Sequence, residues 1–272
     1  MVRHVAHSVL AVLLNPAAHV SHTAAKQRGS DARPRSTSPG KPPLIATPAN
    51  RKAAYDIAAV LAVIVLAWAV CRLWFYPELG IGQNAPVILR PMGGLLTAWW
   101  LLRRRGERWS ALGLCRPASW TRPVIAGIVV YGALIVLSPS VASVLIAWLP
   151  ATVQPADFLA YIHGNLAATL PWLGIAWVVG GFCEEALFRG FLLNRLATLL
   201  GGGPIAMTVG VIAQALLFGS LHFYGGSIAC AQAAFFGLML GIAYLAAGRN
   251  LLPLMVVHGV WDTVGIWGTY TG

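Results

Sequence analysis

Three charged side chains, Glu184, Glu185 and Arg189, lie within a strongly apolar stretch of this 272-residue chain. An ionised side chain costs at least about 2.5 kcal/mol at the centre of a membrane helix, so such residues usually face a protein interior and serve a function. On an α-helix Glu185 and Arg189 are neighbours one turn apart, whereas Glu184 points elsewhere. We expect Glu185 to be ionised and structural and Glu184 to suit general acid–base chemistry. The alternative is a buried ion pair with a spare carboxylate.

Phe218 and His222 are four residues apart, near the end of a later apolar stretch. A histidine near a helix end is, taken alone, more often an interfacial residue than a catalyst. However, one helix would run from Glu184 to Leu200, and after the turn 201–204 a second would return to His222. At the rise of an α-helix these two segments are roughly 24 and 27 Å long. This hairpin predicts that Glu184 and His222 lie nearly level.

His258 and Asp262 have the i,i+4 spacing that places both side chains on one face of a helix. Gly259 leaves room beside them for a close approach by backbone or substrate. A hydrogen bond that only satisfies the pair, or a proton relay in a transporter, would explain the same spacing. In a helix that starts after Arg249, His258 lies only about 10 Å above the turn that precedes the helix. Bringing His258 level with His222 therefore requires tilted helices or a hairpin that projects into the cytosol.

The composition excludes several classes of protein. The chain is 58% hydrophobic and 10% charged, with a mean hydropathy of +0.71, whereas soluble domains have roughly 25% charged residues. Four cysteines are too few for a disulfide scaffold. The net charge is +11, and the basic residues lie mostly in the N-terminal tail and one connecting segment. This distribution is typical of the positive-inside topology of a membrane protein rather than of nucleic-acid binding.

The elements that must position the motifs are apolar stretches close to the roughly 20 residues that a helix needs to cross a membrane. Strands of that length would alternate apolar and polar residues, and these do not. The sequence predicts an all-α polytopic membrane protein, a bundle of about seven transmembrane helices within residues 53–272. The second stretch is the weakest and is also consistent with a re-entrant segment. The stretches are residues 54–75, 86–102, 123–149, 170–193, 204–223, 227–247 and 251–269.

Basic residues predict the orientation of the bundle. Residues 1–52 form a basic tail that we expect to be disordered. Segment 103–122 contains six arginines and one acid, whereas segment 150–169 has no lysine or arginine. The positive-inside rule then predicts a cytoplasmic N-terminus. We expect the protein to lie in the plasma membrane. Arg72 and Arg90 fall near the outer interface, where we expect them to snorkel.

The motifs Glu-Glu-x-x-x-Arg, Phe-x-x-x-His and His-x-x-x-Asp, in this order over residues 170–265, resemble the CPBP family of intramembrane endopeptidases. That family groups the type II CAAX prenyl endopeptidases with bacteriocin-processing and bacteriocin-immunity proteins. The prenyl endopeptidases have asparagine at the last position, so Asp262 departs from their pattern. The resemblance implies a water-activating Glu184, a supporting pair Glu185 and Arg189, and further catalytic residues His222, His258 and Asp262.

The chemistry expected of these residues is hydrolysis of a peptide bond near the membrane. Glu184, aided by His222, would take a proton from water, and His258 would stabilise the tetrahedral oxygen. Asp262, if ionised, cannot donate to that oxygen, so it would orient His258 or hold a cation. The family is often called a metalloprotease. The same Glu184, His222 and His258 are candidate ligands for a divalent metal such as zinc, although the chain lacks a His-Glu-x-x-His pair, and we leave metal open.

Two other classes of function are consistent with the same residues. One is an ion- or proton-coupled transporter in which the buried groups form a conducting chain. The other is a non-enzymatic membrane protein of the bacteriocin-immunity type. The partners expected for a protease are a peptide or membrane-protein substrate and the lipid bilayer, with no nucleic acid.

Overall fold

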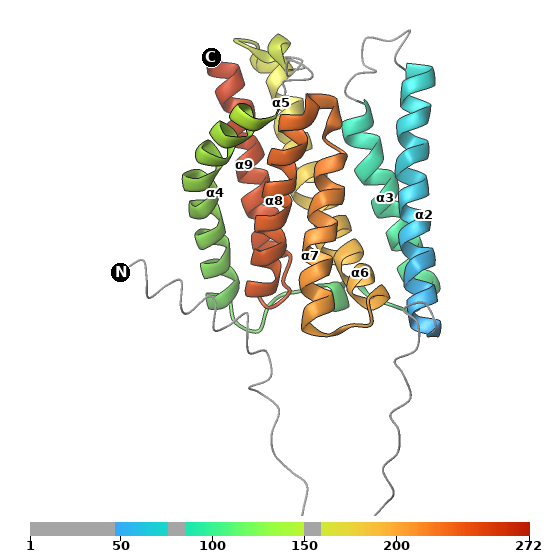
Figure 1. Ribbon diagram of the computed structural model, residues 1–272. Helices are drawn as coiled ribbons and strands as arrows, with labels where there is room; N and C mark the ends of the chain where they lie inside the picture. The colour runs from blue at the N-terminus through green and yellow to red at the C-terminus, as the bar shows by residue number, and fades with distance from the viewer. Residues whose placement is uncertain (1–46, 76–84, 150–158) are drawn as a thin grey trace, which may run out of the picture.

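The computed structural model describes residues 47–75, 85–149 and 159–272, and within these ranges it contains helices and no strand. Most of the long helices run side by side along one common direction, as Figure 1 shows. This arrangement confirms the predicted all-α bundle. Its long elements are α2 (Pro48–Val70), α3 (Ala85–Arg104), α4 (Thr121–Trp148), the run α5 (Leu166–Ile175), η4 (Ala176–Leu192) and α6 (Leu193–Leu199), then α7 (Gly203–Ser220), α8 (Gly226–Ala246) and α9 (Leu252–Thr271).

Six helical segments among the described residues are long and apolar enough to cross a membrane, so the chain is an integral membrane protein. The stretch predicted to be the weakest is one of them, a continuous helix of 20 residues over Ala85–Arg104. The predicted seventh span, α9, is a helix but is not among the six, because His258 and Asp262 lower its mean hydropathy. Helix α9 packs against η4 and α4 inside the bundle.

Helix α2 begins earlier than the sequence predicted. The Thr47 hydroxyl accepts a hydrogen bond from the Asn50 backbone N–H at 3.2 Å, which is the geometry of an N-cap, and Pro48 occupies the first turn. Residues 48–52, which the sequence analysis assigned to the tail, are therefore helical. Residues 1–46, on which the rest of that prediction falls, lie outside the described residues.

The run from Leu166 to Leu199 differs from the predicted α-helix because its middle part, η4, is a π-helix of 17 residues. Hydrogen bonds in a π-helix join residues five apart, and such segments are rare and frequent at functional sites. A π-helix rises less per residue than an α-helix. The helical segment from Glu184 to Leu200 is therefore shorter than the length calculated with a rise of about 1.5 Å per residue. The turn Gly201–Gly203 has positive φ at all three glycines and reverses the chain into α7, as predicted.

Helices η4 and α9 pack closely because glycines line their contact. A Cβ at Gly181 would lie 2.8 Å from the Met255 carbonyl oxygen, and one at Gly259 would lie 2.7 Å from the ring of Trp177. Small residues permit such an approach between membrane helices. The predicted close approach at Gly259 is thus made by a side chain of η4, and it holds the His258 segment of α9 against η4.

Basic side chains gather at one end of the bundle, which we call the basic end. It contains Arg103 and Arg104 at the end of α3, Arg122 at the start of α4, Arg195 in α6, and Arg249 between α8 and α9. This end is at the bottom of Figure 1. The arrangement agrees with the segregation of positive charge that the sequence suggested.

Candidate active site

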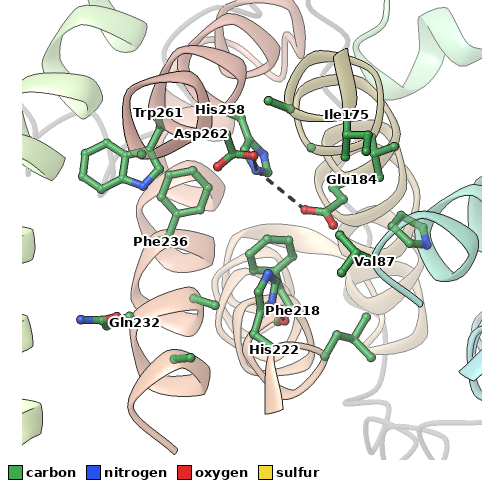
Figure 2. A pocket seen from close by; sticks show the side chains of 18 of the residues that line it. Val87, Ile175, Glu184, Phe218, His222, Gln232, Phe236, His258, Trp261 and Asp262 are labelled. Carbon is green, nitrogen blue, oxygen red and sulfur yellow. Dashed lines mark hydrogen bonds and ion pairs between the residues drawn. The ribbon is translucent and has the colours of Figure 1, made fainter. Parts of the chain in front are cut away.

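One cavity of about 480 Å³ lies in the half of the bundle away from the basic end. Its wall contains the N-terminal part of α3, the distal half of α4, the run α5–η4, and parts of α7, α8 and α9. Figure 2 shows that Glu184, His258, Asp262 and His222 all lie around this cavity. Phe236 and Trp261 form an aromatic part of the wall. The helices thus bring together the four residues that the sequence suggested as catalytic.

Glu185 is the centre of a buried hydrogen-bonded group. Its Oε1 atom accepts from Arg189 Nη1 at 2.7 Å, as the i,i+4 spacing predicted, and lies 2.7 Å from His258 Nδ1. The side chains of Glu185 and Arg189 are fully buried. Because a carboxylate only accepts hydrogen bonds, Nδ1 of His258 must carry the proton. Glu185 therefore fixes the orientation of the His258 ring across the η4–α9 contact, a role that the sequence reasoning had offered to Asp262.

The other ring nitrogen of His258 faces two carboxylates on the cavity wall. Nε2 lies 3.4 Å from Asp262 Oδ2 and 3.7 Å from Glu184 Oε2, and Figure 2 marks the contact with Glu184. The Glu184 side chain is 14% exposed and that of Asp262 is 34% exposed, so both reach the cavity. Glu184 and Glu185 thus occupy different environments, as the sequence suggested.

His222 lies just beyond the end of α7, not on the helix as predicted. Its Nδ1 is 2.9 Å from the Phe218 carbonyl oxygen, so Nδ1–H donates and Nε2 is left as an acceptor. The Phe218 ring stands between the two histidines, with centroid distances of 4.7 Å to His222 and 6.2 Å to His258. His222 therefore shares the cavity with His258, and an aromatic ring separates the two imidazoles.

Comparison with known proteins identifies the segment that carries these residues. Residues 166–264 match the family model of the Rce1-like type II CAAX prenyl endopeptidases. This segment is similar to that family, and we refer to residues 166–264 as the Rce1-like domain. No curated protein and no solved structure shows a significant match to the chain. The match covers the whole motif region and indicates a membrane protease.

The side chains of the Rce1-like domain do not fit a metal centre as they lie. Within the described ranges, no group of three or more His, Cys, Asp or Glu side chains is arranged to hold a metal ion. The Phe218 ring separates His222 from His258, so two of the three predicted ligands do not converge. A three-ligand site needs such convergence. We therefore derive no catalytic step through a metal.

Sequence reasoning misplaced one residue of the cavity wall, Arg90. It was expected to snorkel at an interface, yet it is only 8% exposed, and it lines the cavity. It lies on α3, outside the residues matched by the family model. An arginine within an apolar stretch was the available signal, because such a residue usually faces a bundle interior.

Proposed function

We propose that this chain is an intramembrane endopeptidase that hydrolyses a peptide bond in the cavity, with Glu184 activating the attacking water. The observation that carries the proposal is the convergence of Glu184, His258 and Asp262 within 4 Å on the wall of a cavity that His222 also lines. The Rce1-like match supports it independently, because the family indicates a membrane protease.

The proposed reaction begins when Glu184 takes a proton from a water molecule in the cavity. The resulting hydroxide attacks the carbonyl carbon of the scissile amide, and the electron pair moves to the carbonyl oxygen. When this tetrahedral intermediate collapses, the C–N bond breaks and the amine leaves with the proton that Glu184 carried. His222 assists through its free Nε2, which can accept a hydrogen bond from the water. No covalent bond to the enzyme is needed.

His258 is assigned to the developing negative charge on the carbonyl oxygen. Its Nδ1–H donates to Glu185, so the ring cannot rotate away, and its Nε2 points at the cavity. A ring protonated at both nitrogens donates to Glu185 on one side and to the tetrahedral oxygen on the other. Asp262 lies beside Nε2 and stabilises that charged ring, whereas Glu185 holds its orientation.

The test uses purified protein in liposomes and a library of quenched-fluorescence peptides, with and without an S-farnesyl cysteine. Glu184→Gln keeps the size of the side chain and removes the base. Glu107→Gln is the matched control, because Glu107 pairs with Arg195 at the basic end, away from the cavity. We expect wild type and Glu107→Gln to cleave at similar rates, and Glu184→Gln to lose at least about a hundredfold, within the range for general-base removal.

Two outcomes separate this proposal from its alternatives. A Glu184→Gln protein that is folded, inserted and cleaves at the wild-type rate would refute the role of Glu184. Ion or proton flux in the same liposomes that depends on His258 and Asp262, without any peptide cleavage, would instead indicate a transporter.

The orientation proposed for the site follows from the basic end. With the arginines of that end in the cytoplasm, the cavity lies in the outer half of the plasma membrane, so its peptide substrate approaches from outside the cell. Cys115 is an exposed native thiol next to Arg116 on the basic side. A membrane-impermeant maleimide should label Cys115 only after the cells are opened, whereas an Ala167→Cys thiol at the other end should be labelled on intact cells. The reverse pattern would contradict this orientation.

A further inference from the structure

Arg90 presents a buried positive charge to the cavity. Its Nε donates to the Pro86 carbonyl oxygen at 2.8 Å, and Nη1 donates to the Leu221 carbonyl oxygen at 2.9 Å. The guanidinium carbon lies 5.7 Å from the centre of the Tyr224 ring. These contacts join α3 to the end of α7 beside His222 and hold the guanidinium in place. They use two of its five N–H groups.

Arg90 differs from the other buried charged residues in lacking a carboxylate partner. Asp56 binds Arg105 at 2.6 Å, and Glu185 binds Arg189 at 2.7 Å. Among the described residues, no ion pair forms on Arg90, and its polar partners are neutral carbonyl oxygens. Charges buried in a membrane protein are normally paired, because an uncompensated ion is costly in a low dielectric. The remaining N–H groups of Arg90 make no hydrogen bond within the described residues, and Arg90 lines the cavity that Glu184 also lines.

We propose that Arg90 binds a carboxylate of the peptide substrate and thereby selects the peptides that the cavity accepts. This inference rests on the proposed peptidase function. A guanidinium with parallel free donors matches the two oxygens of a carboxylate and holds them in one orientation. Arg90 and Glu184 lie on helices that pack against each other, α3 and η4, so a carboxylate bound by Arg90 sets where the chain crosses Glu184. Arg90 is a substrate-binding residue in this account.

The carboxylate has two sources, the C-terminus of the peptide and an acidic side chain. The experiment separates them with three synthetic forms of the best-cleaved library peptide: a free acid, a C-terminal amide, and an amide with one glutamate in place of glutamine. Values of kcat and KM are measured for wild type, Arg90→Gln and Arg90→Lys. Arg103→Gln is the control, because Arg103 is an exposed arginine on the same helix at the basic end.

We expect wild type to prefer a carboxylate-bearing form by at least about tenfold in kcat/KM, mainly through KM. Arg90→Gln should lose that preference and cleave the carboxylate-bearing forms no faster than the all-amide form. Arg90→Lys should recover part of it, and Arg103→Gln should behave as wild type. A preference for the free acid would identify the C-terminus as the source of the carboxylate, and a preference for the glutamate form would identify an acidic side chain. A loss of equal size for every form in Arg90→Gln would assign Arg90 a structural role and overturn the inference, as would equal cleavage of all forms by wild type.

Binding supplies a readout that does not depend on turnover. In the Glu184→Gln background, the carboxylate-bearing peptide should raise Tm, and adding Arg90→Lys or Arg90→Gln should reduce that shift. If no peptide is cleaved but this Arg90-dependent shift is present, the peptidase proposal fails and the anion site stands. If cleavage depends on Glu184 but every peptide form binds alike, the inference about Arg90 fails and the peptidase proposal stands. The same holds if only anionic lipid produces an Arg90-dependent change in Tm.

Discussion

Two ionic clusters of the bundle differ in how their carboxylates are paired. The first, the basal network, consists of Asp56, Glu107, Arg105 and Arg195. Both Asp56 oxygens are bound by arginine, at 2.6 and 2.9 Å, and Arg195 also binds Glu107 at 2.7 Å. Two acids meet two arginines, so the charges of the network balance.

The second cluster, the cavity cluster, consists of Glu184, Glu185, Arg189, His258 and Asp262. Glu185 is paired through its Oε1 atom with Arg189 and with His258 Nδ1. Among the described residues, Glu184 and Asp262 form ion pairs only with the shared Nε2 of His258, and both side chains reach the cavity. A charge-balanced network of ion pairs holds helices together, whereas carboxylates that reach a cavity are available for chemistry. The comparison therefore assigns stability to the basal network and catalysis to the open side of the cavity cluster.

The largest effect is expected from Arg189→Met, compared with Arg195→Met. Arg189 is fully buried, and its loss leaves the Glu185 charge without a cation, so the free energy of unfolding should fall by roughly 3 to 5 kcal/mol and cleavage should be lost. Arg195→Met should cost less, because Asp56 keeps Arg105. Unfolding in mixed detergent measures both. Equal losses in the two variants would break the distinction between the clusters.

Asp56→Asn should separate stability from activity. Removing this carboxylate leaves Arg105 without an acidic partner and Arg195 with Glu107 alone. Both arginines are partly exposed and can turn to water, so we expect a loss of about 2 kcal/mol. The kcat of the protein that stays folded should be within about twofold of wild type. A tenfold fall in that kcat would show that the basal network takes part in catalysis.

Gly180→Ala should produce a smaller change confined to the cavity. A Cβ there would lie 2.5 Å from Asp262 Oδ2 and 3.2 Å from His258 Nε2, so both side chains must shift. We expect kcat to fall about tenfold, because small displacements of catalytic groups are costly, with little change in stability. Gly174→Ala is the control, since nothing lies within 4 Å of its Cβ. Unchanged kcat in Gly180→Ala would mean that the positions of Asp262 and His258 do not limit the reaction.

The sequence predicted the parts of this structure that depend on local pattern. Apolar length predicted the helices, and i,i+4 spacing predicted the Glu185–Arg189 pair. Three features were not predicted because they depend on tertiary packing. The π-helix of η4 has no strong local signature, and the Glu185–His258 bond joins residues 73 apart. The basal network also joins distant residues, although Asp56 was visible as an acid within the first apolar stretch.

The central claim is that Glu184 and His258 act on the same reacting atoms in one cavity. The most direct test measures kcat for Glu184→Gln, His258→Gln and the double variant with the best-cleaved library peptide in liposomes. Groups that act as a unit show strongly non-additive losses. We predict that the double variant is no slower than the slower single variant. Losses that multiply in the double variant, or a wild-type rate in either single variant, would contradict the claim.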